Sequence, residues 1–144
     1  MRRLLAGIAC SLMVVAASTN SAGQEPPDPF AAVRARGQGL LVFIDHCASC
    51  HGRSGHGDGP RVEELTVRPS DLTQLSERNG WIFPKESVAR AIDGADRAHR
   101  TGEMPLWGQA FRLDPSVPDD AAVKQRIEAL TMYLEFIQVR RPRR

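Results

Sequence analysis

The most chemically distinctive stretch of the chain is Cys47-Ala48-Ser49-Cys50-His51. Two residues separate the thiols, and the imidazole directly follows the second thiol. This C-x-x-C-H pattern is typical of covalent haem attachment, in which each sulfur forms a thioether bond with one vinyl group of the porphyrin. His51 is then carried under the ring, where a ring nitrogen can bind the iron. The pattern therefore predicts a c-type haem held by Cys47, Cys50 and His51.

Three other chemistries use a pair of cysteines at this spacing. A thioredoxin-like redox pair needs a strand before the motif, whereas the preceding residues have a helical pattern. A zinc half-site needs a second pair of ligands, but no cysteine follows Cys50 and the other histidines lack paired spacing. Those histidines are His46, His56 and His99. A structural disulfide is the third alternative, and the added His51 together with an export signal favours haem over all three.

Residues 1–23 have the pattern of a secretory signal. Two arginines form a basic start, and the apolar run from Leu4 to Ala17 is shorter than the ~18 residues expected of a spanning helix. Cleavage is expected after Gly23, with an uncleaved membrane anchor as the alternative. Cys10 lies in the apolar run and is expected to leave with the signal. These features predict a periplasmic protein with no membrane span in its mature form.

The charge of the chain without residues 1–23 indicates which partners to expect. Without residues 1–23 the chain loses two of its 19 basic side chains and no acid, so 17 basic and 17 acidic side chains remain. Such a balance argues against nucleic acid as a partner.

We expect a signal peptide at residues 1–23, a flexible leader at 24–32, a single small domain at 33–139 and a basic tail at 140–144.

Three stretches have helical patterns, and strand patterns are weak throughout. The helical stretches are Phe30 to His46, Pro84 to Asp93 and Ser116 to Val139. Proline at the start of the second stretch suits a first helical turn. Ser116 and Asp119 are expected to form a capping box at the start of the third stretch. The pattern therefore predicts an all-helical domain.

Two connecting segments lack any apolar period. Gly52 to Pro69 is rich in glycine and is expected to form a long loop, which packs its backbone against a flat cofactor. A short helical piece should follow, with Ser70 or Asp71 as its cap. Ala95 to Gly108 is also expected to be irregular.

Haem iron has a second axial position. After removal of the signal, Met104 and Met132 are the methionines that could fill it. Met132 lies within the last predicted helix, whereas Met104 precedes Pro105, whose fixed φ stiffens the chain. A thioether ligand favours Fe(II) and raises the reduction potential. We therefore expect His51 and Met104 to bind the iron, with His99 as the next candidate.

Taken together, these residues resemble the class I cytochromes c across nearly all of residues 33–139. The matching segments are Gly39, Phe43, Cys47 to Gly52, Gly55 to Pro60, Pro69 to Thr73, Gly102 to Trp107, Leu130 and Tyr133. The resemblance implies an all-α fold in which three to four helices wrap around one covalently bound haem, with long loops between them. The segments around Ser70 and Met104 look like those of small bacterial single-haem members.

The resemblance also implies specific contacts between the first and last helices. Gly39 and Phe43 would pack against Leu130 and Tyr133. This crossing offers a reason for a glycine inside the first helix.

Around the haem, the resemblance implies two supporting groups. The carbonyl of Pro60 would accept a hydrogen bond from the second ring nitrogen of His51, which fixes the ring and increases its donor strength. Trp107 would pack near a haem propionate, with plain core packing as the alternative.

The expected function is that of a periplasmic one-electron carrier, and not of an enzyme in its own right. Its partners would be redox proteins that dock weakly and briefly. The lysine-rich docking face of mitochondrial-type members is absent, so their docking mode is not carried over. Two alternatives stay open: a haem subunit of a periplasmic dehydrogenase or oxidase complex, and a gas sensor or peroxidase in which Met104 is labile.

Overall fold

The computed structural model describes residues 28–95 and 104–142 of the chain, and within these ranges it contains helices and no strands. Four of the described α-helices are longer than a single turn: α1 (Ala31–His46), α4 (Lys85–Asp93), α5 (Trp107–Leu113) and α6 (Asp120–Phe136). The short elements are α2 (Ala48–His51), η1 (Val62–Glu64), η2 (Leu72–Gln74) and α3 (Leu75–Arg78). The predicted all-α fold class is confirmed.

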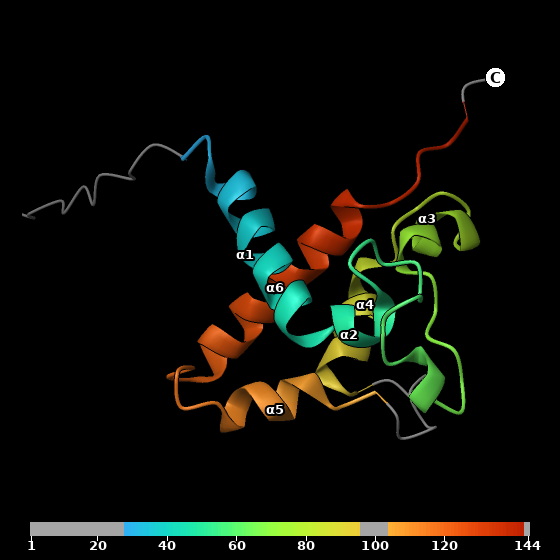
Figure 1. Ribbon diagram of the computed structural model, residues 1–144. Coiled ribbons are helices and arrows are strands. Elements are labelled where there is room, and N and C mark those ends of the chain that lie inside the picture. Colours follow the sequence, from blue (N-terminus) through green and yellow to red (C-terminus); the bar gives the residue numbers. More distant parts are fainter. Residues whose placement is uncertain (1–27, 96–103, 143–144) are drawn as a thin grey trace, which may run out of the picture.

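The frame of the domain is the crossing of α1 and α6, the most extensive contact between any two described elements. Figure 1 shows α1 running across α6, with α5 lying below them and α4 near the centre of the view. Gly39 permits the crossing, because an added Cβ would meet the carbonyl of Ala129 and would lie 2.8 Å from Cβ of Tyr133. The rings of Phe43 and Tyr133 are 5.2 Å apart between centroids, so the crossing expected from the resemblance is confirmed.

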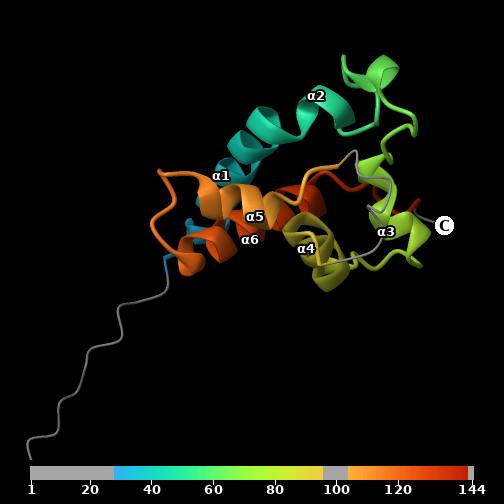
Figure 2. The same cartoon turned by 90° about the horizontal axis from the view of Figure 1, so that it is seen from below.

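The core extends from this crossing to the other helices. Its fully buried side chains include Phe43, Phe111, Val123 and Leu130. Cys47 and Ala48 belong to the same buried cluster, so the core extends directly into the C-x-x-C-H motif. Seen from below, α2 and α4 lie on opposite sides of the molecule (Figure 2). The motif is therefore fixed to the frame at one end of α1.

The last helix differs at both ends from its prediction. Asp119 is the cap, since its side chain accepts a hydrogen bond from the amide of Ala122, whereas Ser116 bonds to Asp114 and takes no part in a capping box. The helix ends at Phe136 and not at Val139. Its end is drawn away because the amide of Val139 donates to the carbonyl of Thr73.

Helix α5 lies partly inside the segment that was expected to be irregular. It begins at Trp107 and buries Gly108 and Phe111. An added Cβ on Gly108 would meet the carboxylate of Asp93 at the end of α4, which shows how closely the two helices approach. With seven residues, α5 is too short to give a clear apolar period in the sequence.

Candidate functional site

The three residues of the motif that could bind a haem lie on one helical turn. Cys47 follows the last residue of α1, and its amide donates to the carbonyl of Phe43. The amide of His51 donates in turn to the carbonyl of Cys47 over 2.9 Å. The turn ends at Gly52, whose φ of 78° is a left-handed conformation suited to glycine. Both thiols and the imidazole are therefore presented from a short, hydrogen-bonded segment.

Neither cysteine of the motif forms a disulfide. Burial, with a smaller contribution from the nearby Cys50, raises the pKa of Cys47 to about 12. Redox-active C-x-x-C pairs depend on a lowered thiol pKa, so this environment does not favour the thioredoxin-like alternative. Among residues 28–95 and 104–142, no three His, Cys, Asp or Glu side chains are grouped closely enough to hold a metal ion. The zinc alternative therefore has no ligand set in the described part of the chain.

The ring of His51 is oriented by a backbone carbonyl. Its Nδ1 lies 3.1 Å from the carbonyl oxygen of Ser70. The prediction that Pro60 supplies this carbonyl is wrong, because Nδ1 carries a single hydrogen and the oxygen beside it belongs to Ser70. A ring that donates from Nδ1 has its lone pair on Nε2, the arrangement required of a histidine that binds a metal.

The glycines between the motif and Ser70 explain this geometry. The amide of Gly57 donates to the carbonyl of His51 over 2.8 Å, and that of Gly59 donates to the carbonyl of Cys50 over 3.1 Å. The loop thus folds back over the motif. Gly57 has a φ of 73°, and a Cβ there would meet the carbonyl of Pro69. Because Gly57 lacks a side chain, the chain at Pro69 and Ser70 can approach the motif.

Met104 lies shortly before a closely packed contact between Leu106 and the end of α4. It is partly buried and stands just before α5. Leu106, two residues later, packs so closely against Gly94 at the end of α4 that an added Cβ on that glycine would lie 2.7 Å from the leucine side chain. Met132 is partly buried within α6, as its predicted helical position implied. His99 lies outside the described residues, and the choice of Met104 as second ligand stays a prediction.

An aromatic group that no sequence pattern indicated lies next to the motif. The ring of His46 is 5.1 Å from that of Trp107 and 5.3 Å from that of Phe111, between centroids. Trp107 and Phe111 are themselves stacked at 5.9 Å. Trp107 thus packs against the residue that precedes Cys47, and its predicted place beside a propionate stays a prediction. Residues from separate helices form this group, so no local pattern could have indicated it.

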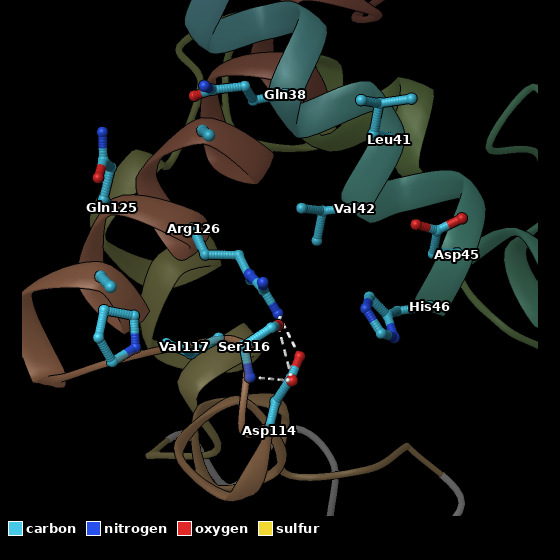
Figure 3. Close-up of a pocket in the computed structure, with 13 residues that line it drawn as sticks. Gln38, Leu41, Val42, Asp45, His46, Asp114, Ser116, Val117, Gln125 and Arg126 are labelled. Carbon is cyan, nitrogen blue, oxygen red and sulfur yellow. Dashed lines mark hydrogen bonds and ion pairs between the residues drawn. The ribbon is translucent and has the colours of Figure 1, made fainter.

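A pocket of about 520 Å³ lies between α1 and the segment leading into α6 (Figure 3). Its side chains include His46, Asp114 and Arg126, and the last two form an ion pair of 2.9 Å. Hydrogen bonds from the Ser116 side chain and backbone, then from Arg126, lower the pKa of Asp114 to about 2. Neither motif cysteine nor His51 lines this pocket, so it is separate from the candidate haem site.

The donor set of the motif fits a haem, since it combines two thiols outside any disulfide with an imidazole that donates from Nδ1. The family model described as Cytochrome c matches residues 35–135. Comparisons with curated proteins and with solved structures found no match. Within the described residues, no helix has the length and apolar character needed to cross a membrane. From the site and the family match together, the chain belongs to the cytochrome c family and is an electron-carrying haem protein that works with redox partners.

Proposed function

We propose that this chain is a periplasmic carrier of single electrons. One haem would be attached covalently through Cys47 and Cys50, and its iron would be bound by His51 and Met104. The observation that carries the proposal is the turn from Cys47 to His51, in which His51 donates from Nδ1 to the Ser70 carbonyl. A histidine held in this way is suited to a permanent ligand, because ring orientation and donor strength are both fixed.

The chain's own part in electron transfer is to hold two ligands still. The bound haem would supply the redox chemistry by exchanging one electron at its iron. His51 is fixed by its helical turn and by Ser70, while Met104 stands beside the packed junction of α4 and α5. If His51 and Met104 both held the iron in this way, no position would remain for a substrate and little rearrangement would accompany reduction.

The proposed location rests on the sequence. Residues 1–23, the proposed signal peptide, lie outside the described residues, and so do residues 24–27 of the proposed leader at 24–32. The proposed cytochrome domain at 33–139 extends slightly beyond the 35–135 match on both sides. The basic tail at 140–144 would follow it.

A groove beside the last residues favours a second candidate, a haem subunit of a periplasmic dehydrogenase or oxidase complex. Its volume is about 610 Å³. Ile82 and Phe136 line it and are 70% and 62% exposed, and Arg140 and Arg141 line it as well. Large exposed apolar side chains that gather on one surface are typical of a protein contact. A free carrier would run as a monomer in an extract of its source, whereas a subunit would copurify with a partner.

The ligand assignment can be tested with two methionine variants. Met104→Ala should abolish the near-infrared charge-transfer band of a thioether bound to Fe(III), because the sulfur is removed. Met132→Ala is the matched control and should leave the band in place, since Met132 lies within α6. An unchanged band in Met104→Ala would contradict the proposed ligand. Carbon monoxide binding to the reduced native protein at neutral pH would instead support a sensor or peroxidase with labile Met104.

A further inference from the structure

We infer that His56 and Asp71 act as positioning residues that set the reduction potential of the haem, by holding the Ser70 carbonyl against His51. This inference rests on the proposed function, since it requires His51 to bind the iron. Both residues lie outside the C-x-x-C-H motif. Their influence would pass through the segment 70–73, which they hold in place.

Asp71 is the centre of the arrangement. One carboxylate oxygen accepts hydrogen bonds from the amide and the hydroxyl of Thr73, at 2.8 Å and 2.6 Å. The other oxygen lies 3.3 Å from Nδ1 of His56. Burial opposes ionisation of Asp71, but the hydrogen bonds from Thr73 and His56 outweigh it and lower its pKa. The carboxylate therefore ties the glycine loop to the start of η2.

We call the contacts of Asp71 with His56 and Thr73 the clamp. Two further hydrogen bonds to backbone carbonyls complete it. The amide of Leu72 donates to the carbonyl of Gly55 over 2.7 Å, and the guanidinium of Arg78 donates to the carbonyl of Asp71 over 2.6 Å. Ser70 immediately precedes these held residues. Its carbonyl is thus fixed in position by the loop on one side and by α3 on the other.

The position of this carbonyl affects the iron through His51. A hydrogen bond from Nδ1 makes the imidazole a stronger donor, and a stronger donor stabilises Fe(III) relative to Fe(II). If the clamp loosens, this hydrogen bond weakens and the potential should rise. When the reduction potential of a one-electron couple rises by about 59 mV, the ratio of oxidised to reduced protein at a fixed applied potential falls tenfold.

His56→Ala gives the sharpest test, because the clamp and simple electrostatics predict opposite signs. Removing an imidazole can only take positive charge away from the surroundings of the haem, which would leave the potential unchanged or lower it. Loosening the clamp should raise the reduction potential. The ratio of oxidised to reduced protein at a fixed applied potential should then fall by up to about tenfold. His56 is 52% exposed in its side chain, so this variant should fold. His56→Gln keeps a donor for Asp71 and should restore most of the native potential.

Three further variants separate the clamp from charge and from helix capping. Arg61→Ala removes a neighbouring exposed cation that pairs with Glu64, and its potential should not rise. Asp119→Asn alters the cap of α6, whereas Asp71→Asn alters both the cap of η2 and the contact with His56. Only Asp71→Asn should raise the potential. Because loss of a negative charge would also raise it, His56→Ala is the variant that distinguishes the clamp from charge.

The measurement is spectroelectrochemical titration of each haem-loaded protein, together with NMR of the Nδ1–H of His51 in the reduced state. The clamp predicts a raised potential and faster solvent exchange of that proton in His56→Ala. A native or lowered potential with native exchange would overturn the inference while leaving the proposed function intact. Evidence that His51 does not bind the iron in the native protein would instead overturn the proposed function.

Discussion

The crossing of α1 and α6 and the glycine loop at residues 52–70 are stabilised in different ways. At the crossing, large side chains are buried, with Phe43 0% and Leu130 1% exposed. In the loop, the buried residues are all glycines, and every residue with a side chain is exposed or only partly buried. The buried glycines are Gly52, Gly55, Gly57 and Gly59. Apolar packing stabilises the crossing, whereas backbone hydrogen bonds and polar contacts hold the loop.

This difference indicates separate tasks for the two regions. The crossing has its own apolar core, which includes Cys47 and Ala48 of the motif. The loop has no apolar core of its own, so it depends on the neighbours against which its backbone lies, Cys50 and His51 among them. Damage to the crossing should therefore lower global stability, and damage to the loop should change the haem environment first.

The largest expected effect is on global stability at the crossing. Phe43→Ala removes a fully buried ring and should lower the free energy of unfolding by about 3–5 kcal/mol. Phe136→Ala is a matched control, since Phe136 is 62% exposed, and should cost less than about 1 kcal/mol. Guanidinium unfolding followed by circular dichroism measures both. Equal losses in the two variants would remove the basis for treating the crossing as the frame.

A glycine pair on α1 should give effects of opposite sign. Gly39→Ala places a Cβ against the carbonyl of Ala129 and should cost about 1–3 kcal/mol through overpacking. Gly37 lies two residues away on the same helix, with no heavy atom within 4 Å of an added Cβ. Gly37→Ala should stabilise by up to about 1 kcal/mol through helix propensity. Thermal unfolding gives both signs, and a stabilised Gly39→Ala would contradict the close crossing.

Gly57 and Gly80 both have a left-handed backbone, and substitutions at these two positions test whether the loop positions His51. Gly57→Ala and Gly80→Ala should each cost about 1–2 kcal/mol, because both positions have positive φ. Only the Cβ of Gly57→Ala meets another group, the Pro69 carbonyl beside Ser70. The haem absorption spectrum and potential should therefore change in Gly57→Ala and stay native in Gly80→Ala. Identical spectra in both variants would show that the loop does not position His51.

The smallest expected effect concerns stability at low pH and involves Asp114, in the pocket between α1 and the segment leading into α6. The pKa of Asp114 is lowered from 3.8 to about 2, so its contribution to stability is present above pH 3.8 and is lost as the pH falls toward 2. Asp114→Asn should be less stable than the native protein at pH 7, and the difference should shrink across that interval. Melting temperatures from pH 7 to pH 2 measure it, and a constant difference would contradict the ion pair with Arg126.

How far the sequence was sufficient differs between the same two regions. Along α1 and α4, apolar periodicity predicted helices close to their observed bounds, and the resemblance predicted the contact of Phe43 with Tyr133. The C-x-x-C-H spacing alone predicted Cys47, Cys50 and His51 as haem-binding residues, since that chemistry is encoded in five consecutive positions. Such features are local or repeat along one element.

The errors lie where long-range contacts decide the structure. Ser70 rather than Pro60 faces His51 because Gly57 lets a later segment approach, and no local pattern encodes that approach. The end of α6 was placed too late because Val139 bonds to Thr73 from a distant element. The stacking of His46 on Trp107 likewise joins α1 to α5.

Covalent haem attachment is tested most directly by the haem content of the exported chain, produced in a host with haem-attachment machinery. We predict that the denatured protein keeps its colour, gains the mass of one haem and gives a pyridine haemochrome spectrum typical of two thioether bonds. Cys47→Ala should shift that spectrum toward one thioether bond. A colourless native chain with unchanged mass and two titratable thiols would contradict haem attachment at this motif.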